Sequence, residues 1–288
     1  MLTVPHTTRG IWPTRIAHGR FAATVRRDHP TGCQVALLGL PDDAGVKLNH
    51  GRVGAAGGPR AVRAALAGYG AAQAHWPTVF DAGDVVPART LGETHARVTA
   101  ATTALLDAGL FPIAIGGGHD LTFPFVRAVA AKYPKLIGLY FDAHLDVRET
   151  PGSGMPFRKL IENCGVPALH LHGYRLWVNS PEHRAWFLHH GGKIHPDGAD
   201  VVLPRGKNLF VSFDLDVLDA AHAPGVSALN PSGWTVPHAE QWIYACGECP
   251  RVRCFDLMEL NPRHDAAHRT ARIAAHLLLA FIEGYSHR

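Results

Sequence analysis

Three apolar runs, far apart along the chain, each lead directly into a short segment that carries aspartate or histidine. The runs span 111–115, 136–141 and 208–213. The segments that end or follow them are Gly116-Gly117-Gly118-His119-Asp120, Asp142-Ala143-His144-Leu145-Asp146 and Ser212-Phe213-Asp214-Leu215-Asp216. Continuous apolar runs of this length predict strands that are buried on both faces of a sheet. Because a parallel sheet gathers its functional groups at the carboxyl ends of its strands, we expect two histidines and four aspartates to meet in one crevice.

Four carboxylates in one poorly solvated crevice repel one another strongly unless positive charge neutralises them. A metal centre supplies that charge, so the segments predict a metal site, with two metals as the favoured arrangement. The aspartates and histidine of 142–146 alternate along the chain, as do the aspartates of 214–216, which places each set on one face of an extended segment. Carboxylate with imidazole suits Mn²⁺ and other divalent first-row ions, zinc and iron included, whereas the lack of a thiolate argues against a structural zinc site.

The length and composition predict one large α/β domain. The chain has 288 residues, of which 47% are hydrophobic, enough for a substantial core. Its net charge is +4, and the basic residues are dispersed, which argues against a nucleic-acid-binding protein. No apolar stretch approaches the roughly 18 residues of a membrane span, and the N-terminal segment lacks a signal peptide's apolar core. We therefore expect a cytoplasmic protein that binds neither nucleic acid nor membrane.

The cysteines and most of the 20 histidines are not assigned to the site. Five cysteines, an odd number, indicate reduced thiols, and the C-x-x-C of Cys246 and Cys249 has no second pair that would complete a zinc site. We interpret it as a coincidence. Only His119 and His144 are predicted to be ligands. The histidines predicted to be solvated are His183, His189, His190 and His195.

Strand and helix signals alternate from end to end of the chain. We predict strands at 33–40, 79–80, 111–115, 136–141, 208–214 and 251–257. We predict helices at 60–66, 93–108, 121–132 and 265–285, and a loop that leads into a helix at 150–165. Residues 173–207 are expected to hold further elements without assigned bounds. The alternation predicts a largely parallel sheet with helices on both faces, arranged as an N-terminal arm (1–32) and a single catalytic domain (33–288).

With these motifs the sequence resembles the ureohydrolase superfamily of arginases, agmatinases and formimidoylglutamases, over roughly residues 35–285. Further segments that carry the resemblance are Asn49-His50-Gly51-Arg52, Asp81-Ala82-Gly83-Asp84 and Asp256-Leu257-Met258-Glu259-Leu260-Asn261-Pro262. The resemblance implies a three-layer α/β/α sandwich with a mainly parallel sheet. It also implies a homo-oligomer, whose size the sequence does not fix.

The resemblance assigns roles to the motif residues and implies two Mn²⁺ ions per chain. The first ion would be held by His119, Asp142, Asp146 and Asp214. The second would be held by Asp142, His144, Asp214 and Asp216, with Asp142 and Asp214 bridging. A hydroxide between the metals would attack a carbon that bears two nitrogens. Glu259 would meet the cationic head of an amidine or guanidino substrate, and Asp146 would carry a proton to the leaving amine.

The loop after the second metal segment resembles that of formimidoylglutamases. Its sequence is Ser153-Gly154-Met155-Pro156-Phe157-Arg158, in which Met155 replaces the usual threonine. The histidine that arginases and agmatinases place here as a proton shuttle has no evident counterpart. Arg148 and Arg158 would bind the two carboxylates of N-formimidoyl-L-glutamate, because guanidinium groups bind carboxylates through paired hydrogen bonds. The resemblance thus implies hydrolysis of this substrate to glutamate and formamide, a step of histidine degradation.

Three other interpretations stay open at the level of sequence. The first is an arginase- or agmatinase-type ureohydrolase that acts on another guanidino compound. The second is a single-zinc amidohydrolase of the deacetylase type, which needs fewer ligands. The third is an inactive family member that serves as a binding or assembly subunit, against which the full set of six predicted ligands argues.

Overall fold

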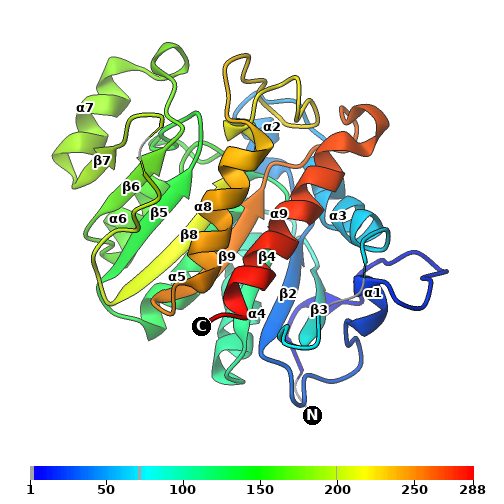
Figure 1. Cartoon of the computed structure of the whole chain (residues 1–288). Helices are drawn as coiled ribbons and strands as arrows, with labels where there is room; N and C mark the ends of the chain where they lie inside the picture. Colours follow the sequence, from blue (N-terminus) through cyan, green and yellow to red (C-terminus); the bar gives the residue numbers. More distant parts are fainter. Residues whose placement is uncertain (1–2, 71–72, 199) are drawn as a thin grey trace.

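The computed structural model describes residues 3–70, 73–198 and 200–288, which form a nine-stranded sheet between two layers of helices (Figure 1). The strands are β1 (Thr7–Thr8), β2 (Val35–Leu40), β3 (Val79–Val85), β4 (Phe111–Gly116), β5 (Leu136–Phe141), β6 (Leu169–His172), β7 (Gly192–Ile194), β8 (Asn208–Asp214) and β9 (Val252–Met258). The α-helices are α1 (Phe21–Thr24), α2 (Ala44–Leu48), α3 (Gly58–Leu66), α4 (Leu91–Asp107), α5 (Thr122–Lys132), α6 (Pro156–Cys164), α7 (Pro181–His189), α8 (Val236–Glu248) and α9 (Arg269–Tyr285).

The strands follow the order β1-β3-β2-β4-β9-β8-β5-β6-β7 across the sheet. Among the described strands, β1 alone runs antiparallel, to β3, and the other neighbours pair in parallel. The predicted α/β sandwich with a mainly parallel sheet is therefore confirmed. The four central strands are β4, β9, β8 and β5, and three of them precede the metal segments that the sequence indicates.

Each face of the sheet carries its own hydrophobic core. Helices α3, α8 and α9 cover one face, and α4, α5 and α6 cover the other, so that α8 and α9 lie in front of the strands in Figure 1. Alternate residues of one strand enter different cores: Val35 and Leu37 face the first, and Ala36 and Leu38 face the second. This burial on both faces explains why the strands are continuous apolar runs without a polar alternation.

Local signals set where several helices begin and end. The hydroxyl of Thr90 accepts from the amide of Glu93, whose carboxylate accepts from the amide of Thr90, and this capping box starts α4. Helix α9 begins at Arg269, later than the predicted residue 265. The reason is that the Asp265 carboxylate accepts from the first-turn amides of α9, at Thr270 and Ala271, and a short 3₁₀ turn intervenes.

A buried ion-pair group fastens α3 to β3. Arg63 is fully buried, and its guanidinium lies 2.8 Å from Asp81 and 2.5 Å from Asp84. Two carboxylates and one guanidinium satisfy most of one another's hydrogen bonds away from water, which is the condition for tolerating such charges in a protein interior. The Asp81-Ala82-Gly83-Asp84 segment thus has a structural partner on the neighbouring helix.

The structure adds elements where the sequence gave no bounds. The segment 173–207 contains α7 and β7, and β6 directly precedes it. The segment 1–32, predicted as an irregular arm, contributes β1, which pairs Thr7 with Val85, and the short helix α1. Cys246 and Cys249 are buried free thiols. Among the described helices, none is both long enough and apolar enough to span a bilayer.

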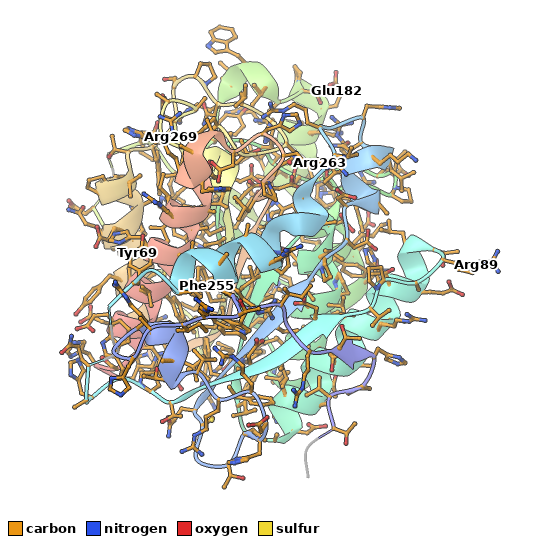
Figure 2. The ribbon with its side chains drawn as sticks, turned by 90° about the vertical axis from the view of Figure 1, so that its right-hand side faces the viewer. Tyr69, Arg89, Glu182, Phe255, Arg263 and Arg269 are labelled. Atoms are coloured by element: carbon orange, nitrogen blue, oxygen red, sulfur yellow. The ribbon has the colours of Figure 1, made fainter. Side chains whose placement is uncertain are left out.

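The carboxyl ends of the parallel strands all point to one end of the molecule. Figure 2 shows that end at the top: Glu182 of α7 and Arg263, which follows β9, both lie in the upper part of the view, and Phe255 within β9 lies lower. Functional side chains in the turns after the central strands are therefore brought to a common crevice.

Candidate metal centre

The turns after the four central strands carry the side chains of the site. His119 follows β4, residues 142–146 follow β5, Asp214 ends β8 with Asp216 in the next turn, and Glu259 follows β9. The backbone of Asp146 (φ 47°) and of Glu259 (φ 68°) is left-handed, a conformation that residues other than glycine rarely adopt. The fold holds these two carboxylates in unfavourable backbone conformations, which is common at functional sites.

The first set of facing ligand atoms is centred on His119. Its Nδ1 atom lies 3.2 Å from Asp142 Oδ2, 3.0 Å from Asp146 Oδ2 and 3.0 Å from Asp214 Oδ2. All four side chains offer atoms within 4.8 Å of one another. Three carboxylates around one imidazole nitrogen exceed what a single N–H can satisfy, so the arrangement fits a cation at the centre of the set.

The second set shares Asp142 with the first. His144 Nδ1 lies 3.3 Å from Asp142 Oδ1 and 3.0 Å from Asp216 Oδ2. The two oxygens of Asp142 therefore face different histidines, the geometry expected of a carboxylate between two metals. Asp214 falls in the first set only, so its predicted bridging role stays a prediction. The structure thus brings together all six residues that the sequence indicates as ligands.

Uncompensated negative charge marks this crevice. Burial, together with the charges of Asp146 and Asp216, raises the pKa of Asp142 to about 6. Burial also raises the pKa of Asp214 well above its usual value, with further contributions from Asp216 and Asp142. Burial opposes protonation of His119, but the surrounding carboxylates outweigh it and raise its pKa well above the usual value. Cations at the two sets would remove this repulsion.

Two buried atoms at the heart of the site lack a hydrogen-bond partner of acceptable geometry among the described residues. They are Nδ1 of His119 and Oδ2 of Asp142, which lie 3.2 Å apart. Buried polar atoms in native proteins are almost always paired. With Nδ1 of His119 deprotonated, these two atoms would present facing lone pairs to one ion, so the residues present fit a two-metal centre.

His119 is oriented from behind by two buried polar residues. Its Nε2 atom lies 3.0 Å from the hydroxyl of Ser212, which donates to Asp256 at 2.6 Å. Because the hydroxyl hydrogen is used on Asp256, the serine oxygen accepts the N–H at Nε2 of His119. This tautomer leaves the lone pair at Nδ1 free for a metal, as is usual when the second nitrogen of a ligating histidine has a polar partner.

Glu259 lies beside the metal sets but outside them. Its carboxylate is buried, accepts from the amide of His119 at 2.7 Å and accepts from the hydroxyl of Ser227. Burial raises its pKa to about 8, although the hydrogen bond from Ser227 and that from the His119 amide partly offset this effect. A cationic substrate group would restore its negative charge. The position fits the predicted role of Glu259 in meeting an amidinium.

A cavity of about 340 Å³ opens beside these residues. Of the residues predicted for substrate and proton handling, Asp146, Arg148 and Glu259 line it. Arg158 does not. Its guanidinium lies 2.8 Å from Glu162 and over the ring of Trp186 of α7 at 4.7 Å. The two arginines predicted as a pair are therefore not brought together at the cavity, and contact of Arg158 with substrate stays a prediction.

The cavity is also lined by residues that the sequence interpretation did not assign. Asn179 and His183 come from the segment 173–207, Asn49 and His50 from the loop after α2, and Ser153 from the loop before α6. His183, predicted to be solvated, is half-buried here, and burial lowers its pKa, with Arg148 adding to the effect.

His195, also predicted to be solvated, packs instead against other side chains. Its ring stacks on His172 with centroids 4.3 Å apart, and its Nε2 atom lies 3.0 Å from His170 Nδ1. His195 is therefore half-buried, because it directly follows β7, whose pairing with β6 the local composition did not indicate.

Comparison with known proteins shows which family this chain matches. A model of the arginase family matches residues 33–283. The chain is 34% identical over 283 residues to a formimidoylglutamase of Ralstonia nicotianae, covering 88% of this chain and 86% of that protein. It is 35% identical over 277 residues to a formimidoylglutamase of Rhodococcus jostii, covering 86% of this chain and 84% of that protein.

A solved structure agrees with these relatives in fold. The crystal structure of Trypanosoma cruzi formiminoglutamase with Mn²⁺ matches this structure with a TM-score of 0.87 at 30% identity, covering 93% of this chain and 99% of that one. The family model spans nearly all of the sequence, and the match in fold extends over 93% of the chain. The chain belongs to the arginase family.

Proposed function

We propose that this protein hydrolyses N-formimidoyl-L-glutamate to glutamate and formamide, a step of histidine degradation, with two Mn²⁺ ions per chain. The observation that carries the proposal is a two-metal set of ligands whose adjoining cavity holds both a buried carboxylate, Glu259, and an arginine, Arg148. Glu259 suits the cationic amidinium end of the substrate, and Arg148 suits its carboxylates. The names of the relatives support the same substrate. Other divalent first-row ions would suit the same ligands.

Different side chains would bind the substrate and transfer the proton in this reaction. When bound, the two ions would lower the pKa of water so that it is a nucleophile near neutral pH. Glu259 pairs with the amidinium and fixes its carbon in the cavity. Asp146, on the cavity wall, takes a proton from the attacking water and delivers it to the glutamate nitrogen as the C–N bond breaks. The products are glutamate, which keeps the amine, and formamide.

Arg148 is the residue that we propose to select the dicarboxylate tail. Its amide donates to Gly154 at 2.7 Å, which ties the arginine to the loop before α6, and its exposed side chain lies along the cavity. A guanidinium here attracts a carboxylate and disfavours agmatine, which is cationic along its length. Arg158 would join it only if its side chain left Glu162.

The direct test compares three substrates on the Mn²⁺-loaded protein. N-formimidoyl-L-glutamate, arginine and agmatine are supplied side by side, and formamide and urea are measured. Formamide from the first with little urea from the others is the expected result. Urea from arginine or agmatine would overturn the substrate assignment and favour an arginase- or agmatinase-type activity. An Asp142→Ala variant supplies the control for hydrolysis that does not depend on the metal centre.

We further propose a cytoplasmic homo-oligomer, as the family resemblance implies. The mass of the purified protein by light scattering tests the assembly, for which a mass of 31.1 kDa would indicate a monomer. Cell fractionation tests the location.

A further inference from the structure

A second cluster of metal-ligating side chains lies far from the metal centre. It consists of His75, Glu283 and His287, whose ligand atoms all lie within 4.8 Å of one another. Tyr285, between the last two, packs on Phe111 with ring centroids 5.1 Å apart. Phe111 is the first residue of β4, so the cluster lies near the amino ends of the strands, and the metal centre lies at their carboxyl ends. The C-terminus accordingly lies at the lower side of the molecule in Figure 1.

Two of the ligand separations in the cluster are close to those around one tetrahedral ion. His75 Nε2 lies 3.5 Å from Glu283 Oε1, and His287 Nε2 lies 3.3 Å from the same oxygen. Charge-assisted hydrogen bonds are shorter, at about 2.7–2.9 Å. Bonds of about 2.0–2.1 Å from zinc to nitrogen and oxygen set ligand separations of about 3.3–3.4 Å around a tetrahedron. The facing ligands of the metal centre show similar separations, from 3.0 to 3.3 Å.

Glu283 is held so that one oxygen serves both histidines. The indole N–H of Trp76 donates to its Oε2 atom, which leaves Oε1 facing His75 and His287. Trp76 is itself fixed by an edge-to-face contact with Phe21 at 5.9 Å. A polar partner on the second atom of a ligand is the usual arrangement around protein-bound metals.

The chain supplies the three ligands from two distant segments. Glu283 lies in the last turn of α9, His287 follows four residues later in the turn after the helix, and His75 comes from the connection before β3. The side chains of His75, Glu283 and His287 are 51%, 33% and 45% exposed, so water has access to the remaining positions on an ion.

We propose that His75, Glu283 and His287 form a peripheral site for Zn²⁺, separate from the metal centre and outside the proposed reaction. Two imidazoles with one carboxylate are an established donor set for zinc, and a fourth position is left for water. An ion held there joins residues 73–78 to the C-terminal helix. It stabilises the folded chain increasingly as its concentration rises, because the unfolded chain does not bring the three ligands together.

The experiment measures zinc bound by the Mn²⁺-loaded protein in equilibrium dialysis, with elemental analysis of each metal. Wild type is compared with His75→Ala and His287→Ala, and with His276→Ala as a matched control. His276, also on α9, forms a similar pair with Glu240 at 3.2 Å but belongs to no three-ligand cluster among the described residues. Zinc bound at cysteines or at the metal centre is common to all four proteins and cancels in the comparison.

We expect wild type and His276→Ala to bind one zinc more per chain than the other two variants. Zinc should also raise the unfolding temperature of wild type more than that of His287→Ala. Affinity should fall at least about tenfold on loss of a ligand, since even loss of an outer partner costs about 10- to 100-fold. Equal zinc content in all four proteins would overturn the site, and hydrolysis by the Mn²⁺-loaded variants should be unchanged in either case.

Discussion

The hydroxyl of Ser212 fixes the tautomer of His119. The oxygen lies 3.0 Å from Nε2 of the imidazole, while the hydroxyl hydrogen is directed to Asp256. When a metal is bound, the metal-facing Nδ1 of His119 is therefore the nitrogen that supplies the lone pair. Because Ser212 precedes Asp214 on β8 and both are buried, one strand supplies a ligand and the group that orients another ligand.

Replacing Ser212 with alanine should weaken metal binding without unfolding the protein. Loss of an outer partner of a ligating histidine costs about 10- to 100-fold in metal affinity. Titration of the metal-free protein with Mn²⁺ measures the effect. The matched control is Thr102→Val, which also removes a buried hydroxyl but one that bonds only within α4, to Val98. Equal Mn²⁺ affinity in the two variants would contradict the role of Ser212.

Asp142 should matter more to metal content than Asp216, because its two oxygens face both histidines. We expect Asp142→Ala to lose both ions and nearly all activity, whereas Asp216→Ala should retain metal in the set around His119. Elemental analysis after dialysis distinguishes the two cases. Asp214→Ala tests the predicted bridge: loss of both ions supports it, and retention of the second ion argues against it.

Arg148→Ala should raise the KM for N-formimidoyl-L-glutamate by about 10- to 100-fold, because a hydrogen bond to a charged group contributes about 1.5–3 kcal/mol. The kcat should change little if the arginine binds substrate and transition state alike. Steady-state kinetics of Arg148→Ala and Arg158→Ala together decide between the arginines. An unchanged KM in Arg148→Ala would remove Arg148 from the proposal. A raised KM in Arg158→Ala would show that Arg158 contacts the substrate.

Arg63→Met should destabilise the protein by about 3–5 kcal/mol, because it leaves Asp81 and Asp84 buried without their cation. Urea unfolding measures the free energy. Arg60→Met, an exposed position on the same helix, should change it by less than about 0.5 kcal/mol. A small effect of Arg63→Met would mean that water reaches the two carboxylates.

The His170 and His195 pair should make stability depend on pH. Burial lowers the pKa of His170 to about 4, with the charges of His195 and Lys193 adding to the effect. The unfolded chain therefore binds a proton at this residue below about pH 6.5, whereas the folded chain binds it only near pH 4. The free energy of unfolding should fall as the pH drops through that window.

Urea unfolding between pH 7 and pH 4 checks this expectation. His170→Gln should show a shallower loss of stability than wild type, because its side chain does not titrate. His189→Gln, at an exposed histidine on α7, should follow wild type. A parallel decline in all three proteins would assign the pH dependence to other groups.

The sequence predicted the metal centre well because its information is local. Each ligand follows an apolar run, and the fold needs only to place the ends of β4, β5 and β8 together for the ligands to meet. The strand at 136–141 and the strand at 208–214 have the observed bounds. The capping of α9 by Asp265 shifted one predicted helix start, since that contact depends on a turn whose backbone the sequence does not specify.

The substrate end of the site could not be predicted in the same way. Asn179 and His183 reach the cavity because α7 and the turn before it fold over the second metal segment. Asn179 donates to Ala143 and accepts from Leu145, contacts between positions more than thirty residues apart. Arg158, which the sequence predicted at the cavity, pairs instead with Glu162, one helical turn away.

The ligands of the first set become neighbours only when the middle of the sheet is assembled. The ligands of the first set come from three strands, and β9 and β8 must be in place before β4 and β5 lie at their final separation. A nascent chain that has paired only β2 with β4 holds a single ligand, His119, and cannot retain an ion there. Retention of metal at this centre would therefore report that β4, β9, β8 and β5 have paired.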